Sequence, residues 1–346
     1  MLRKRIFPSE NIIFDAMKRF YPLYLLCMAA IVGVAGCQGK TSRETVREES
    51  PAVEVPHFNA DSAYSYMARQ VAFGYRVPGT EAHRATAEWL ASKLQECGAT
   101  VTRQEALLTA WDGTRLPSCN IIGSFAPEKP TRLLLLAHWD SRPYADHDPD
   151  PAFRRKPIDG ANDGASGVGV LLEIARHLAQ NPPQVGVDIL LLDAEDYGAP
   201  REEADDGSSW ALGSQYWAEH PHKPGYRARF AILLDMVGAK GATFYREQFS
   251  QYWAPAVLDK VWAAAARLGY DYLFIDEAGG GVTDDHLYIN RYGIPTIDII
   301  HQEPQSPTGF FPYWHTRGDN MEHIDKTVLE AVGRTVMTVV YEEKIQ

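Results

Sequence analysis

The chain of 346 residues contains only four cysteines, and no two of them are spaced as Cys-x-x-Cys. Since a Cys/His finger pattern is missing too, the common cysteine-based zinc modules are excluded. The sequence also lacks the Gly-x-Ser-x-Gly segment that positions the nucleophile of many serine hydrolases. No internal repeat or low-complexity tract occurs, which leaves acids and histidines of an ordinary domain as the candidate functional groups.

A surplus of positive charge is lacking as well. The net charge is −11, and it becomes −14 when residues 1–36, with five basic and two acidic side chains, are removed. Such an acidic protein is not expected to bind nucleic acid or an anionic lipid surface. The hydrophobic fraction of 45% and the charged fraction of 23% are typical of a globular protein.

The chain has no apolar run long enough to cross a membrane comfortably. Its best candidate, residues 23–36, is short and rich in glycine, but it follows the basic Lys18 and Arg19. This arrangement is typical of a signal peptide, so we expect residues 1–36 to be one. Met17 could itself start a normal signal, which would make the preceding residues an upstream extension.

The end of this segment, Val34-Ala35-Gly36-Cys37, resembles a bacterial lipobox. In such a sequence the cysteine is lipidated, so we expect lipid on Cys37 to be the only membrane contact. The alternative is a plain secretory signal with an incidental cysteine. We predict a polar tether over 37–52, one domain over 53–346, and a location in the bacterial cell envelope, facing the periplasm or the exterior.

The apolar periodicity predicts an α/β fold, a three-layer sandwich whose central mixed, mostly parallel sheet is flanked by helices. Expected helices are 61–73, 80–97, 165–179, 208–219, 256–268, 285–291 and 323–341, and expected strands are 100–108, 115–123, 132–137, 187–192, 229–234, 271–275 and 295–300. Export would permit a disulfide between Cys97 and Cys119. Register alone does not bring these two residues together.

Three of these predicted strands end in acids. Leu133–Ala137 is followed by His138 and Asp140, Ile189–Leu192 by Glu195 and Asp196, and Phe230–Leu234 by Asp235. Short continuous apolar runs indicate strands buried on both faces, and ligands bind beyond the carboxyl ends of such strands. Converging carboxylates repel one another unless a cation lies among them. A mixture of imidazole and carboxylate suits zinc.

Three further sites have both a structural and a functional interpretation. Asp163 precedes a predicted helix and could simply cap it, although its glycine-rich surroundings allow close backbone approach. The Glu195–Asp196 pair could be a solvated loop, but two adjacent acids beyond a buried strand suit a metal ligand and a general base. Asp284 could cap the next short helix, and His315 could be packed among aromatic residues or could complete a zinc site.

As an ordered set, these motifs resemble the zinc-dependent exopeptidases of the bacterial aminopeptidase fold, and most closely the glutaminyl cyclase branch. The resemblance covers roughly residues 60–340. It is carried by His138-Trp139-Asp140, Asn162–Gly167, Asp193–Asp196, Leu234-Asp235, Asp284–His286 and Trp314–Thr316.

The resemblance implies one zinc ion, held by Asp163, Asp196 and His315. It also implies that Glu195, Asp235 and Asp284 form a hydrogen-bonded acid network, with Glu195 as the general base and acid. Zinc would act as a Lewis acid on the γ-carbonyl of an N-terminal glutamine, which would be cyclised to pyroglutamate with release of ammonia. The expected partners are peptides or proteins with N-terminal glutamine, and the expected state is a monomer.

The same resemblance implies a pocket walled by Trp314, Trp210 and Phe311. Asp284 and Trp314 favour the cyclase branch, since aminopeptidases usually have a small hydroxyl residue and a different aromatic there. Asp196 departs from the glutamate that is usual in animal cyclases. The loop 197–210 also differs from theirs, which leaves the identity of the pocket tryptophan open.

Two other functions stay open. In a two-zinc aminopeptidase, His138 and Asp235 would bind a second ion together with Asp163, whereas in a cyclase His138 and Asp140 would support the single site from behind. A non-catalytic binding module would have lost members of the acid set, and Glu195, Asp235, Asp284 and His315 are all present.

Overall fold

The computed structural model describes residues 53–345. The predicted signal peptide, the lipidated Cys37 and the tether lie outside this range. Within it, none of the helices combines the length and the apolar character needed to cross a membrane.

Eight α-helices and eight strands make up the described chain. In order they are α1 (Ala60–Ala72), α2 (Glu81–Glu96), β1 (Thr100–Thr109), β2 (Arg115–Phe125), β3 (Arg132–His138), α3 (Ala165–Gln180), β4 (Gly186–Leu192), α4 (Leu212–Glu219), β5 (Ala231–Asp235), β6 (Phe244–Arg246), α5 (Gln248–Trp253), α6 (Pro255–Arg267), β7 (Phe274–Ala278), α7 (Asp285–Tyr292), β8 (Thr296–Ile300) and α8 (Lys326–Glu342).

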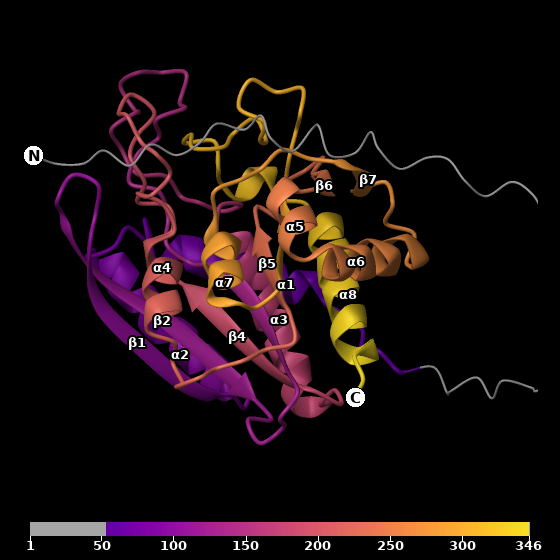
Figure 1. Cartoon of the computed structure of the whole chain (residues 1–346). Helices are drawn as coiled ribbons and strands as arrows, with labels where there is room; N and C mark the ends of the chain where they lie inside the picture. Colours follow the sequence, from indigo (N-terminus) through magenta and orange to yellow (C-terminus); the bar gives the residue numbers. More distant parts are fainter. Residues whose placement is uncertain (1–52, 346) are drawn as a thin grey trace, which may run out of the picture. The chain divides into compact units, whose positions relative to one another are not determined.

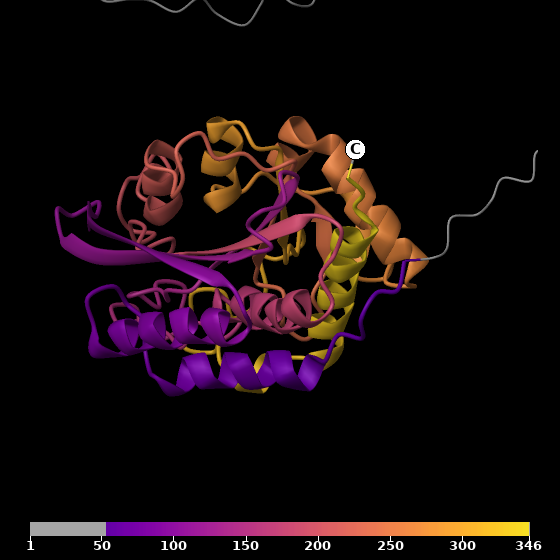
Figure 2. The same ribbon diagram turned by 90° about the horizontal axis from the view of Figure 1, so that it is seen from below.

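Six strands form one sheet in the order β1-β2-β4-β3-β5-β8 (Figure 1). The β1–β2 hairpin and the β2–β4 pair are antiparallel, whereas β4, β3, β5 and β8 are parallel neighbours. Figure 2 shows this sheet almost edge-on, with the indigo α1 and α2 on one side and the salmon α4 on the other. The predicted three-layer, mostly parallel α/β fold is confirmed.

Strand β3 shows why the apolar runs form central strands. Leu133 and Leu135 belong to the large core cluster, which also holds residues of α1, α3 and α8. Leu134 and Leu136, which point the other way, pack in the second cluster against residues of α4 and α7. A strand covered on both faces needs a continuous apolar run and not an alternating one.

The structure corrects several predicted boundaries and adds three short elements, β6, α5 and a 3₁₀ helix over Met321–His323. The helix expected at 208–219 begins only at Leu212, after Ala211 adopts a left-handed φ of 55°. The strand expected at 271–275 is β7, three residues further along. The short β6 and α5 were not predicted, because three to six residues are too few for periodicity to show. Cys97 and Cys119 are both free.

Candidate functional site

A cavity of about 270 Å³ opens beyond the carboxyl ends of the central parallel strands. The acids that follow β4 and β5 lie together in its wall, as the sequence predicts. The lining residues are Asp163, Glu195, Asp196, Gly207, Trp210, Asp235, Met236, Gly281, Val282, Thr283, Asp284, Ile300, Phe310, Trp314 and His315.

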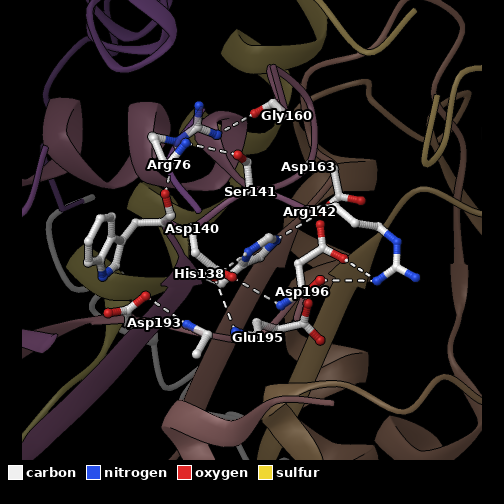
Figure 3. Close-up of polar contacts among 12 residues, drawn as sticks. Arg76, His138, Asp140, Ser141, Arg142, Gly160, Asp163, Asp193, Glu195 and Asp196 are labelled. Atoms are coloured by element: carbon white, nitrogen blue, oxygen red, sulfur yellow. Dashed lines mark hydrogen bonds and ion pairs between the residues drawn. The ribbon is translucent and has the colours of Figure 1, made fainter. Parts of the chain in front are cut away.

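Asp140 ties the ends of β3 and β4 together (Figure 3). Its Oδ1 accepts the backbone N–H of Glu195 at 3.1 Å and lies 3.3 Å from Nδ1 of His138. Its Oδ2 accepts the N–H of Asp196 at 3.2 Å. The side chain is fully buried, so this one carboxylate sets the direction of the whole acid pair. Asp140 is not among the residues that line the cavity, and it supports the site by holding the backbone of Glu195 and Asp196.

Asp163 is not a helix cap. Helix α3 begins at Ala165, and its N-cap residue Gly164 makes no side-chain capping bond. The backbone N–H of Asp163 is instead held by the buried Asp319, at 3.1 Å. Gly164 is required by close approach, since a Cβ there would lie 2.3 Å from Nε2 of His138. The Asp163 carboxylate is thus free to face the cavity.

The predicted ligand set comes together in three dimensions. Donor atoms of Asp163, Asp196 and His315 all lie within 4.8 Å of one another. Nε2 of His315 is 3.2 Å from Asp196 Oδ1 and 3.6 Å from Asp163 Oδ2. All three side chains are almost completely buried.

Electrostatics at this group favour a cation. Burial, and then the neighbouring Asp163, raise the pKa of Asp196 well above its usual value. Burial, and then Arg142, lower the pKa of His315 well below its usual value, which keeps the ring neutral. Oδ2 of Asp196 is buried without a hydrogen-bond partner. One neutral imidazole, two carboxylates and an unpaired oxygen fit zinc.

A second group consists of His138, Asp163 and Asp235. Here Nε2 of His138 already lies 3.0 Å from Asp163 Oδ1 and 3.2 Å from Asp235 Oδ1. Burial opposes a charge on this ring, but contacts with Asp140, Asp163 and Asp235 raise its pKa well above the usual value. The three carboxylates around His138 thus favour positive charge at this position.

The three acids of the predicted network share the cavity. Burial, and then Asp284, raise the pKa of Glu195 well above its usual value. Burial, and then Asp163, raise the pKa of Asp235 to about 7. Burial also raises the pKa of Asp284. The charge of Asp284 contributes to raising the pKa of both Glu195 and Asp235. Asp235 also contacts His138, and Asp284 accepts the N–H of Asp285. Asp284 is therefore also the cap of α7.

Two tryptophans wall the cavity. Trp314 stacks on His315 with ring centroids 3.7 Å apart, and Trp210 lies nearly parallel to His315 at 5.8 Å. Phe310 also lines the cavity, whereas Phe311 does not. The prediction for Phe311 was wrong because its side chain turns inward and stacks on His301.

Sequence reasoning missed several residues of this site. Arg142 and Asp146 lie behind Asp196 and His315, and Asp319 holds Asp163 across 156 residues of sequence. Two further groups have metal-ligand spacing, Asp146 with His147 and His315, and Asp284 with His286 and Asp298. Asp319 follows His315 by four residues, but no spacing rule connects a carboxylate there with a ligand 156 residues earlier.

The fold and the site together define an α/β protein with a buried acid-and-histidine metal centre. The profile of Peptidase family M28 matches residues 120–340, and the chain belongs to this family.

Solved structures similar to this chain include two bacterial proteins. A Zn-dependent exopeptidase from Parabacteroides distasonis is 57% identical, with a TM-score of 0.83, over 84% of this chain and 100% of its own. The glutaminyl cyclase of Bacteroides thetaiotaomicron bound to N-acetylhistamine is 55% identical, with a TM-score of 0.82 and the same coverage. Aminopeptidase YwaD of Bacillus subtilis is 30% identical over 259 residues, 72% of this chain. The match spans only 50% of that relative's length.

Proposed function

We propose that this protein cyclises the N-terminal glutamine of peptides or proteins to pyroglutamate and releases ammonia. The observation that carries the proposal is the position of Glu195, a buried carboxyl group with a raised pKa in the wall of a small cavity that also holds the zinc-type ligands. The similarity to a glutaminyl cyclase at 55% identity supports it.

The reaction needs a proton to be moved between two nitrogens. The α-amine of the substrate attacks the γ-carbonyl carbon, the new C–N bond forms, and the bond to the side-chain nitrogen breaks. Glu195 takes the proton from the attacking amine and delivers it to the departing nitrogen, which leaves as ammonia. A raised pKa suits both steps, because the group can hold a proton near neutral pH.

The other residues position the substrate and exclude water. Asp163, Asp196 and His315 would hold the zinc ion, which when bound supplies a Lewis acid for the γ-carbonyl oxygen. Asp235 and Asp284 lie in the same cavity wall as Glu195, and the charge of Asp284 adds to burial in raising the pKa of Glu195. Trp210, Trp314 and Phe310 cover the cavity with apolar surface, which limits the access of water that would hydrolyse the amide.

A two-zinc aminopeptidase is the alternative, and the similarity to aminopeptidase YwaD favours it. Its second ion would need His138, Asp163 and Asp235. Nε2 of His138 lies 3.0 Å from Asp163 Oδ1 and 3.2 Å from Asp235 Oδ1, and its Nδ1 faces Asp140. Two bound zinc ions per chain and release of free N-terminal residues would establish the aminopeptidase.

The role of Glu195 is tested by measuring how fast the Glu195→Gln variant releases ammonia from a peptide that begins with glutamine. General acid–base catalysis contributes about 10²–10⁴-fold, so we expect a loss of at least about 100-fold with zinc content unchanged. Retained activity would refute the role of Glu195, and lost zinc would mean that the variant damages the metal centre instead.

We propose further that the enzyme acts as a monomer in the bacterial cell envelope, tethered through lipid on Cys37. The support is the lipobox-like sequence and the acidic net charge of −11, which disfavours direct contact with anionic lipid. A Cys37→Ser variant should move from the membrane fraction to the soluble fraction, and an unchanged distribution would overturn the lipid anchor.

A further inference from the structure

The loop from Arg142 to Asp148 contacts two of the three predicted ion ligands. It begins four residues after the end of β3, and no motif of the sequence marks it as functional. Arg142 is fully buried, and its Nη1 donates to the backbone oxygen of Asp196 at 3.0 Å. The same nitrogen lies 3.4 Å from Asp196 Oδ1 (Figure 3).

Asp146 holds Arg142 in place with a two-point ion pair. Nε of Arg142 donates to Oδ1 at 2.7 Å, and Nη2 donates to Oδ2 at 2.8 Å. Paired bonds of this kind fix the plane of the guanidinium group as well as its position. Asp146 is 1% exposed, so the pair is shielded from water.

The same carboxylate faces the third ligand. Oδ1 of Asp146 lies 3.6 Å from Nδ1 of His315, a ring nitrogen that is buried and has no hydrogen-bond partner. This distance is slightly too long for a hydrogen bond. A carboxylate next to Nδ1 favours the tautomer that carries its proton on Nδ1. The lone pair of Nε2 then points toward Asp163 and Asp196 and is available to bind the ion.

The backbone of His315 is held by the same loop. His147 donates its N–H to the carbonyl of His315 at 3.1 Å, and Asp148 Oδ2 accepts the N–H of Arg317 at 3.1 Å. His315 needs this support because its φ is 53°, a left-handed value that is uncommon for a residue other than glycine.

Arg142 also reaches the wall of the cavity. Its guanidinium carbon lies 4.6 Å from the ring centroid of Trp210, within the range of a cation–π contact. Trp210 packs closely on Gly198, where a Cβ would lie 2.2 Å from the indole ring. Arg142 Nη1 is 3.4 Å from the carbonyl of Gly198. The ion pair thus touches the ligands on one side and the indole wall on the other.

We propose that the Arg142–Asp146 pair is a positioning unit for the reaction. It orients His315 and Asp196 toward the ion and fixes Trp210 as the wall of the substrate cavity. Arg142 and Asp146 therefore affect both the affinity for the ion and the affinity for the substrate, without contacting either. The substrate part rests on the proposed function, whereas the ion part does not.

The first test is the zinc affinity of the full chain, measured by competition with a chelator. Loss of a group that orients a metal ligand typically weakens binding about 10–100-fold, and we expect Asp146→Asn to fall in that range. The control is Asp188→Asn, because Asp188 forms an equally buried two-point pair with Arg132, at 2.6 Å for both contacts, between β3 and β4. The control should lose stability and keep its zinc affinity.

Zinc affinity equal to the wild type in Asp146→Asn would overturn the proposal, and so would an equal loss in the Asp188→Asn control. If Asp146→Asn does not fold, the double variant Arg142→Met with Asp146→Leu removes both charges together, a change that buried ion pairs often tolerate. The double variant should still bind zinc about 10-fold more weakly, and unchanged binding would again overturn the proposal.

Arg142→Lys separates the two roles. Lysine keeps the positive charge but loses the planar fork and the flat face toward Trp210. We expect KM for a glutamine-initiated peptide to rise several-fold more than the zinc dissociation constant does. A rise in neither quantity would contradict the positioning role. A protein that binds zinc as described but never cyclises the peptide would refute the proposed function and leave the ion part standing.

Discussion

Replacement of Asp140 by asparagine should damage stability and zinc binding together. The carboxylate accepts two backbone N–H groups, those of Glu195 and Asp196, one on each oxygen. An asparagine has a single acceptor oxygen, so its amide nitrogen must face one of these donors. One buried N–H then loses its partner, and the position of the acid pair is no longer fixed.

The size of the effect follows from the lost contacts. A hydrogen bond to a charged group contributes about 1.5–3 kcal/mol, and a buried polar group without a partner costs about 1–3 kcal/mol. The two effects overlap because they concern the same bond, so we expect the free energy of unfolding of Asp140→Asn to fall by about 2–4 kcal/mol. Zinc affinity should fall too, since Asp196 is one of the predicted ligands.

The free energy of unfolding is measured with urea in excess chelator, so that both the variant and the wild type are free of zinc. The difference between them then reports the loss of stability alone. The matched control is Asp112→Asn, because Asp112 also accepts a backbone N–H, from Thr114 at 2.9 Å, but in an exposed turn. The control should change the unfolding free energy by less than about 1 kcal/mol. An Asp140→Asn variant with wild-type stability and wild-type zinc affinity would refute the supporting role of Asp140.

Three further predictions follow from the same geometry. His315→Ala removes the only nitrogen ligand of its group, so zinc measured by mass spectrometry of metals should be largely lost; full occupancy would rule out the ligand role. Gly164→Ala places a Cβ 2.3 Å from His138 Nε2, so activity should fall; Gly241→Ala, where φ is 76° and a Cβ meets nothing within 4 Å, should lose only stability, and equal activity losses would contradict this. Burial lowers the pKa of His222 to about 4 from 6.5, and its Nδ1 accepts a hydrogen bond from Trp217 at 3.2 Å. Because the folded pKa is the lower one, this contribution to stability is present above pH 6.5 and is lost as the pH falls toward 4; His222→Asn should show a smaller loss in urea unfolding over that range, and an identical pH dependence would exclude the histidine as its source.

Much of the fold could be predicted because its central strands are apolar on both faces. The runs that end at His138, Leu192 and Asp235 do not alternate between apolar and polar residues, so they cannot be strands with one face in solvent. The acids at their carboxyl ends must then meet at one edge of a parallel sheet. The short β6 and α5 carry too few residues for a pattern, and Phe311 could not be told from Phe310 because only backbone geometry decides which ring turns inward.

The supporting residues of the site were less accessible to sequence reasoning. Arg142 acts on Asp196 across 54 residues, and Asp319 acts on Asp163 across 156. Such contacts depend on loops whose paths are fixed by tertiary packing and not by local propensity. Asp163 and Asp196 could be found because one precedes a helix and the other follows a strand, where position along the chain implies position in space. His315 lies in a turn between β8 and α8, and the resemblance of its Trp314–Thr316 motif predicted it.

Mass spectrometry of a glutamine-initiated peptide incubated with the purified full chain and zinc tests the central claim most directly. An otherwise identical peptide that begins with alanine is the control. Loss of one ammonia from the first peptide, with the second unchanged, is the result we predict. Loss of the entire first residue would show an aminopeptidase, and two unchanged peptides would contradict the proposed catalysis.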